Sequence, residues 1–331
     1  MKIYFHSPAK IARPLHGKRS RKFEAAGFDR CESVEAVQDA SQADAVYLRN
    51  IPESTTDSLH DALQRFESEC GFAQTLNSVA SLYIHDCKDE CFATWGALDV
   101  PVPAHEVCDD VEQVFAFADQ HPSFLLRINN EACGDDTTLL RAGDERAIRK
   151  AYRSLERRAR RLRRTGRGRT RVMSVAMEGE RDPAGYAGSY RAFLVGSTIV
   201  GGYALIAQED IVHTSNSLCS SAAERESFFA SNSILDDLLQ DSEFQALAAR
   251  AMLATGLDIA CLDFVMTGDQ PCFLEANALW SPSYSWTGGK AGEAHYHANE
   301  SMWRERAANY CSWMDRAEFY RSMYEHIARL A

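Results

Sequence analysis

Apolar and polar positions alternate along the chain with two periods, and each period predicts a type of element. Alternation over short apolar runs predicts strands, whereas apolar residues three or four positions apart predict amphipathic helices. The first part of the chain contains both in turn: strands are expected at 2–5 and 43–48, and helices at 34–40 and 57–69. Strands that alternate with helices predict a small parallel α/β unit at the start of the chain.

The later pattern interleaves strands and helices less regularly. Strands are predicted at 124–128, 172–177 and 191–207, the last forming a hairpin that turns at residues 196–197, and helices at 85–97, 241–256 and 302–330. Asp86 is the expected N-cap of the first of these helices, so Lys88 falls in its first turn. A cation there opposes the helix dipole, which is reasonable if the lysine reaches an anion such as a phosphate. A solvated surface lysine explains the position equally well.

The segment 259–277 carries the most informative polar residues. Its pattern predicts two strands, 259–266 and 271–277, joined by a three-residue turn at 268–270. That turn would place Asp263 opposite Glu275, and side-chain alternation puts Phe273 and Asn277 on the same face as Glu275. Facing carboxylates repel unless a cation lies between them, and oxygen ligands of this kind suit Mg²⁺ that carries nucleotide phosphates. An edge hairpin with its polar face in water is the alternative.

Arginines occur at two unusual places. Arg127 lies within the apolar strand 124–128, where a guanidinium needs an anionic partner. The segment 157–171 holds nine arginines in fifteen residues. Contact with RNA, an acidic peptide or a carrier protein would explain this run. A solvated helix that ends at Gly166, followed by a flexible arginine-rich connection, explains it better because runs of charge are usually exposed.

Composition narrows the class of protein. The chain of 331 residues is 45% hydrophobic with a formal charge of -11, so we expect two or three globular domains and no general nucleic-acid binding. Its 10 cysteines form no CxxC pair, and we find neither a secretory signal nor an apolar run of membrane-spanning length. We therefore expect a cytoplasmic protein with mostly buried thiols. The aromatic and glycine-rich segment 280–292 suits a substrate lid or plain packing, and His295 and His297 alone are too few for a metal site.

Several segments of the chain match, in the same order, the segments of a known family. They are Asn77, HDCKDECFATWGALDVPVP at 85–103, FLLRI at 124–128, YRAFLVGSTIVGGY at 190–203 and LDIACLDFVMTGDQPCFLEAN at 257–277. This ordered set resembles the ATP-grasp superfamily of carboxylate–amine ligases. The resemblance implies an ATP-grasp fold of mixed α/β and α+β class, with a nucleotide between two α+β subdomains. The expected units are an N-terminal α/β domain at 1–84, a central subdomain at 85–171 and a C-terminal subdomain at 172–331.

The resemblance also implies a site. The residues it assigns to Mg²⁺ are Asp263, Glu275 and Asn277, and those it assigns to the adenine hinge are Ser174, Val175, Ala176, Met177 and Glu178. Lys88 would meet the α-phosphate side of ATP, and Arg127 stands where the family usually has a second lysine. Arg191 matches the family arginine that steadies the transferred phosphoryl group or acyl phosphate.

The implied activity is the ATP-dependent joining of a carboxylate to an amine through an acyl phosphate, with release of ADP and phosphate. Its substrates would be an amino acid or small peptide in a biosynthetic pathway, with a free, peptide-linked or carrier-bound acceptor. We also expect the protein to form a homodimer and to bind neither membranes nor nucleic acid. The departures from the family are Arg127 in place of lysine, only Gly134 in the loop after it, and Tyr203 and Leu205 in place of a further arginine. Because of these departures, two alternative functions on the same fold stay open: a nucleotide-binding protein without ligase activity and a small-molecule kinase.

Overall fold

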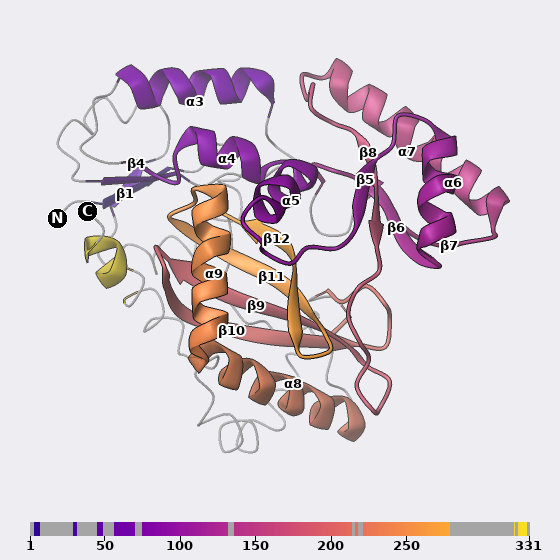
Figure 1. Cartoon of the computed structure of the whole chain (residues 1–331). Coiled ribbons are helices and arrows are strands. Elements are labelled where there is room, and N and C mark those ends of the chain that lie inside the picture. The colour runs from indigo at the N-terminus through magenta and orange to yellow at the C-terminus, as the bar shows by residue number, and fades with distance from the viewer. Residues whose placement is uncertain are drawn as a thin grey trace.

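The computed structural model describes residues 3–6, 29–31, 45–48, 56–69, 75–131, 136–213, 216–217, 221–278, 321 and 324–329. The described strands form three sheets of four strands each, and Figure 1 shows helices packed around them. The expected helix at 34–40, the segment 280–292, His295 and His297 lie outside the described residues. So does most of the expected helix at 302–330, of which residue 321 and residues 324–329 are helical.

The first sheet has the strand order β2-β1-β3-β4, and all its pairings are parallel. Its strands are β1 (Ile3–His6), β2 (Asp29–Cys31), β3 (Ala45–Leu48) and β4 (Thr75–Leu76), and α3 (Asp57–Glu69) precedes β4. The predicted parallel α/β unit is confirmed. Asn77, left-handed at φ 57°, follows this sheet and joins it to the third one. Its side chain accepts hydrogen bonds from the amides of Asp258 and Ile259 and donates to the Ile259 carbonyl.

The second sheet has the order β5-β8-β6-β7, and every pairing is antiparallel. Its strands are β5 (His105–Val107), β6 (Ser123–Ile128), β7 (Thr137–Arg141) and β8 (Val172–Ala176). Helices α6 (Val111–Gln120) and α7 (Glu145–Arg164) pack on one face of it. Phe124, Leu126 and Ile128 enter the core beneath these helices. Because side chains alternate along β6, Arg127 projects from the opposite face.

The third sheet has the order β10-β9-β11-β12 and is antiparallel throughout. Its strands are β9 (Ala187–Val195), β10 (Thr198–Ala207), β11 (Ile259–Thr267) and β12 (Gln270–Asn277). The turn between β9 and β10 at residues 196–197 is the predicted one. Helices α8 (Ala222–Gln240) and α9 (Ser242–Thr255) lie along this sheet in Figure 1. The prediction of α9 is confirmed, with Asp241 capping its start and Gly256 ending it at φ 67°.

Two short helices, α4 (Val79–His85) and α5 (Lys88–Gly96), pack against α9 and β12. Trp95 of α5 is fully buried, with its ring centroid 5.8 Å from that of Phe273 and its indole nitrogen donating to the Ala251 carbonyl at 2.9 Å. Burial of an aromatic side chain of this size contributes roughly 4–6 kcal/mol. This contact fixes α5 against the third sheet and so brings Lys88, its first residue, beside β12.

The predicted N-cap of α5 was wrong. Asp86 is the C-cap of α4, and the residue before α5 is Cys87, which provides no side-chain cap. The Asp86 carboxylate instead lies 2.7 Å from the Nε2 atom of His60 on α3. A buried carboxylate with a close partner across two helices is therefore used to join α3 to α4 rather than to start α5.

The division into segments 1–84, 85–171 and 172–331 stays a proposal. Strand β8 belongs to the third segment but pairs with β5 and β6 of the second. No helix among the described residues is both long enough and apolar enough to cross a membrane.

Candidate active site

The hairpin of β11 and β12 carries two carboxylates face to face. Asp263 pairs with Glu275 across the strands, as predicted. The loop, however, has two residues, at 268–269, and a register shift between Asp263 and Phe264 restores the expected pairing. This bulge corrects a second expectation: Phe273 pairs with Phe264 and lies in the apolar core, on the face opposite Glu275. The bulge thus places Glu275 on the polar face of the hairpin and Phe273 on the face that packs into the core.

Asp263 is 8% exposed, so the alternative of a hairpin with its polar face in water does not apply to it. Three groups contact its carboxylate: Arg191 Nη2 at 3.0 Å, the Asn277 amide nitrogen at 3.2 Å and the Cys261 thiol at 3.2 Å. Arg191 reaches it because β9 and β11 pair with these two residues in register. Burial raises the pKa of Asp263 to about 6, although Arg191 favours the charged form.

Arg191 is also held from β10. Its Nη1 atom donates to the Tyr203 hydroxyl at 2.9 Å, and the two residues pair in register across β9 and β10. Burial alone would lower the pKa of Arg191, but Asp263 and Tyr203 raise it well above its ordinary value. The guanidinium is therefore a permanent cation, clamped between a carboxylate and a phenol.

Lys88 enters the site from the first turn of α5. It is 4% exposed, and its ammonium lies 2.9 Å from Glu275 Oε1 and 3.0 Å from the Glu131 carbonyl oxygen. Burial lowers the pKa of Lys88, while Glu275 favours the charged form. Burial would raise the pKa of Glu275, but Lys88 and Arg127 outweigh it and lower that pKa. The alternative of a solvated surface lysine is therefore wrong.

Arg127 lies next to Lys88 because one backbone oxygen binds both. Its Nη2 atom donates to the Glu131 carbonyl at 2.9 Å, the same oxygen that accepts from Lys88. Burial lowers the pKa of Arg127, and the charges of Glu275 and Glu131 act against that effect. An arginine stays charged at neutral pH in any case. The anionic partner expected for this guanidinium is thus Glu275, acting through space rather than by a direct ion pair.

The polar atoms of this face fit a magnesium ion that carries phosphates. The Asn277 amide nitrogen donates a hydrogen bond to Asp263, so the Asn277 amide oxygen is the atom that could bind a metal. Together with two carboxylates it forms an oxygen donor set suited to Mg²⁺. In the described part of the chain no three His, Cys, Asp or Glu side chains gather as a complete metal site. Within it the buried Arg191 Nε atom also has no hydrogen-bond partner, which leaves a donor for an anion.

The expected hinge residues lead from the second sheet to the third. Ser174, Val175 and Ala176 are buried in β8, and Met177 and Glu178 are half-buried beyond it. The Ser174 hydroxyl lies 3.3 Å from the Cys108 thiol. Just after this segment, the Glu180 amide donates to the Met266 carbonyl on β11 at 3.1 Å. Residues 174–178 therefore span the junction of the two sheets, and their assignment to adenine stays a prediction.

The sequence pattern does not single out two charged residues that support the site. Glu131 and Arg167 are both buried and form an ion pair, and Arg167 also donates to the Asn130 carbonyl. These contacts fix the turn after β6, whose carbonyl at Glu131 holds Lys88 and Arg127. The signal available was the acidic residue three positions after the strand end, in a stretch that the sequence pattern indicates only as a polar turn.

The expected flexible connection after α7 was therefore wrong. The helix ends at Arg164, and Gly166 adopts φ 87°, close to the predicted end. Beyond it, Arg167 is 6% exposed, and Arg169 donates to Glu90 at 3.1 Å and lies over the Tyr83 ring, 3.3 Å from its centroid. Arg167 and Arg169 are thus built into the junction of α5, β6 and β8, whereas Arg171, the last arginine of the run, is exposed.

No family model matches the sequence, and a search of the curated proteins finds no match. Several solved structures are similar. The ATP-grasp ligase PsnB, in complex with its precursor peptide PsnA2 and AMPPNP, is 16% identical, with 100% of this chain and 97% of that chain covered and a TM-score of 0.53. A RimK domain ATP-grasp protein from Sphaerobacter thermophilus is 18% identical, with 88% and 98% covered and a TM-score of 0.52. D-alanine–D-alanine ligase from Bacillus anthracis is 10% identical, with 100% and 98% covered and a TM-score of 0.56. The chain has the ATP-grasp fold.

Proposed function

We propose that the protein is an ATP-dependent ligase that joins a carboxylate to an amine. One observation carries the proposal: two facing carboxylates, Asp263 and Glu275, lie among three fixed cations contributed by three different elements. Phosphoryl transfer needs an arrangement of this kind, because the enzyme mainly positions charged groups and neutralises developing charge. The similarity to PsnB and to D-alanine–D-alanine ligase adds support for a ligase.

The proposed reaction has two steps. A carboxylate oxygen of the first substrate forms a bond to the γ-phosphorus of ATP, and the bond from that phosphorus to the β-phosphate oxygen breaks, which releases ADP. The nitrogen of an amine then attacks the carbonyl carbon of the acyl phosphate, and phosphate leaves with the electron pair of the broken carbon–oxygen bond. The amine loses a proton, and an amide results.

The roles of the residues follow from their contacts. Lys88 and Arg127, both held by the Glu131 carbonyl, would bind phosphate oxygens of the nucleotide. Arg191, fixed by Asp263 and Tyr203, would stabilise charge on the transferred phosphoryl group. Asp263, Glu275 and Asn277 would hold Mg²⁺, which would supply positive charge that neutralises part of the phosphate charge.

The adenine ring is proposed to lie at residues 174–178, between the second and third sheets. Burial of Ser174 and its neighbours in β8 leaves the half-buried Met177 and Glu178 as the residues accessible to a ligand. Under the same proposal the unit at 1–84 contributes substrate contacts, and the protein acts on an amino acid or a peptide.

Product analysis tests the proposal. We expect the protein, given ATP, Mg²⁺ and panels of amino acids and peptides, to release ADP and phosphate together with an amide product. Release of AMP and pyrophosphate would reject the acyl-phosphate route. A phosphorylated product that persists in the absence of amine would indicate a kinase, and tight ATP binding without turnover a nucleotide-binding protein.

A variant locates the site. Glu275→Ala should abolish Mg²⁺-dependent ATP turnover and leave the fold in place, as checked by circular dichroism. Glu106→Ala, the same change at an exposed position of β5, is the control and should keep full turnover. Full turnover in Glu275→Ala would mean that the site is misplaced.

A further inference from the structure

Helix α7 presents a continuous row of cations to solvent. The exposed cations of the row, named here the basic stripe, are Arg146, Lys150, Arg153, Arg157, Arg161 and Arg164. Their spacings of three and four residues place them on one side of a helix, opposite the buried Ile148, Tyr152, Leu155 and Ala159. At 1.5 Å per residue the stripe is about 27 Å long.

The remaining arginines of α7 have acidic partners. Arg149 lies 3.3 Å from Glu112, and Arg158 lies 2.9 Å from Asp136. Arg160 and Arg163 share Glu156, at 2.7 and 3.0 Å. Among the described residues, no member of the basic stripe has an ion pair. The helix thus separates cations that stabilise the fold from cations that face outward.

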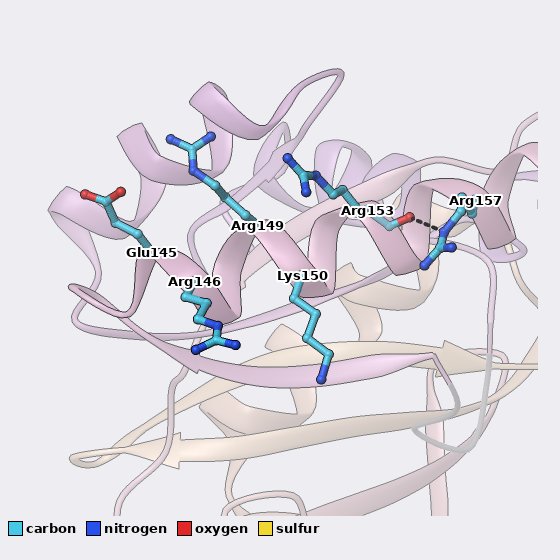
Figure 2. Close-up of a pocket in the computed structure, with 6 residues that line it drawn as sticks. All are labelled: Glu145, Arg146, Arg149, Lys150, Arg153 and Arg157. Carbon is cyan, nitrogen blue, oxygen red and sulfur yellow. Dashed lines mark hydrogen bonds between the residues drawn. The ribbon is translucent and has the colours of Figure 1, made fainter.

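The outward cations border a hollow on the surface. Its lining residues are Glu145, Arg146, Arg149, Lys150, Arg153 and Arg157, which Figure 2 shows spread along α7 with Glu145 as the one carboxylate among them. The formal charge of the whole chain is -11, so this concentration of positive charge contrasts with the rest of the protein. Mutual repulsion among neighbouring cations on a helix is destabilising, which makes an anionic partner favourable.

The stripe leads toward the candidate active site. It ends at Arg164, and the chain then passes through Gly166 to Arg167, whose guanidinium pairs with Glu131. The Glu131 carbonyl in turn binds the Lys88 ammonium at 3.0 Å. A ligand that lies along α7 with one end at Arg164 therefore approaches the residues that surround Lys88.

We propose that the basic stripe docks an acidic segment of a polypeptide substrate. An arginine guanidinium can bind one carboxylate through two parallel hydrogen bonds, and the positive charge of the stripe is complementary to an acidic segment. Nucleic acid fits the stripe less well, because proteins that bind single strands add aromatic platforms for the bases. Tyr152 is the one aromatic residue of α7 and is buried. Docking itself does not depend on the ligase activity, whereas the identity of the partner as substrate rests on the proposed function.

The spacing of the stripe favours a helical partner. Its charges recur on average every 3.6 residues, or about 5.4 Å along the axis. Carboxylates three and four residues apart on a second helix repeat at the same distance, as in paired helices. Alternate residues of an extended strand are about 6.6 Å apart and would lose register within a few charges.

Binding of a defined peptide tests the proposal. The probe is a fluorescein-labelled helical peptide with glutamates alternately three and four residues apart, measured by anisotropy without ATP. The test variant combines Lys150→Glu, Arg153→Glu and Arg157→Glu. The control combines Arg65→Glu, Arg250→Glu and Arg329→Glu, three exposed cations outside the stripe, and changes the net charge by the same amount.

We expect the Kd of the test variant to rise about tenfold or more, because three exposed attractions become repulsions, and that of the control to change less than about twofold. Binding to wild type should weaken as salt is added. Equal affinity of wild type and test variant, or an equal loss in the control, would overturn the proposal. So would tighter binding of a mixed-sequence single-stranded RNA through the same residues.

A second readout separates docking from catalysis. Glu275→Ala, which the proposed ligase requires to be inactive, should bind the peptide as tightly as wild type. In the test variant, ATP turnover with small substrates should be unchanged and turnover with the acidic peptide should require more peptide. If the test variant turned over the peptide with an unchanged KM, the stripe would not be a substrate-docking surface, and the ligase proposal would still stand.

Discussion

The ion pair of Lys88 and Glu275 can be tested by removing one charge. In Glu275→Gln the ammonium stays buried with only uncharged acceptors, which are the Glu131 carbonyl and the oxygen of the new amide. Loss of one partner of a buried pair costs about 3–5 kcal/mol, and we expect the lower end because the Glu275 side chain remains 19% exposed. The lysine can escape the penalty by losing its proton. From the ordinary pKa of 10.5 to pH 7 this costs about 5 kcal/mol at 1.36 kcal/mol per unit, which sets a ceiling.

The pH dependence of this cost has a definite sign. A lysine whose pKa is lowered in the folded state binds fewer protons there than in the unfolded chain, so stability rises with pH in the window below 10.5. The ceiling falls to about 2 kcal/mol at pH 9, where deprotonation is easier. The destabilisation caused by Glu275→Gln should therefore shrink from about 3 kcal/mol at pH 7 to at most about 2 kcal/mol at pH 9.

Urea unfolding of the full chain without metal or nucleotide measures these values. The double variant Lys88→Met/Glu275→Gln is the control, and it should recover to within about 1 kcal/mol of wild type because neither charge remains buried. A destabilisation below about 1 kcal/mol at pH 7, or one that does not fall as pH rises, would show that Lys88 is not a buried cation dependent on Glu275.

Three further outcomes follow from single contacts. Asn77→Ala should destabilise the protein by about 2–4 kcal/mol in urea unfolding, because several hydrogen bonds to the chain at Asp258 are lost; an unchanged midpoint would contradict this joint. Tyr203→Phe frees one side of Arg191 and should lower kcat for ATP turnover while KM for ATP stays similar, whereas an unchanged kcat would remove Tyr203 as a positioning residue. Burial raises the pKa of Cys87 from 9.0 to about 12, so its thiol should resist iodoacetamide at pH 8 until the protein unfolds. The stability that Cys87 contributes through its raised pKa should be lost as the pH rises from 9 to 12. Rapid alkylation of Cys87 in the native protein, found by peptide mass mapping, would refute this.

The hydrophobic pattern predicts most of the described fold because its signals are local. Strict alternation and a short turn indicate the hairpin 259–277, and periodic apolar residues with an acidic start and a glycine stop indicate α9. Asp86 shows the limit of such signals. A carboxylate before a helix has the chemistry of an N-cap, but a histidine on α3, distant in sequence, takes it instead.

The candidate site is predictable where side chains act on their own strand or its direct partner. The pairing of Asp263 with Glu275 follows from alternation, although the bulge that moves Phe273 to the other face has no local signature. The ion pair of Glu131 and Arg167 cannot be predicted from the sequence. The segment holds nine arginines, and only the fold determines that Arg167 is buried. Such a pair depends on tertiary contacts across 36 residues.

The most direct test of the proposed nucleotide site is to count bound metal with Mn²⁺ in place of Mg²⁺. Electron paramagnetic resonance would measure free Mn²⁺ in solutions of protein with ADP, for wild type and for Asp263→Asn/Glu275→Gln. We predict that wild type removes Mn²⁺ from solution in a nucleotide-dependent way and that the double variant, still folded, does not. Equal Mn²⁺ binding by the two proteins would contradict the assignment of the β11–β12 carboxylates to the metal.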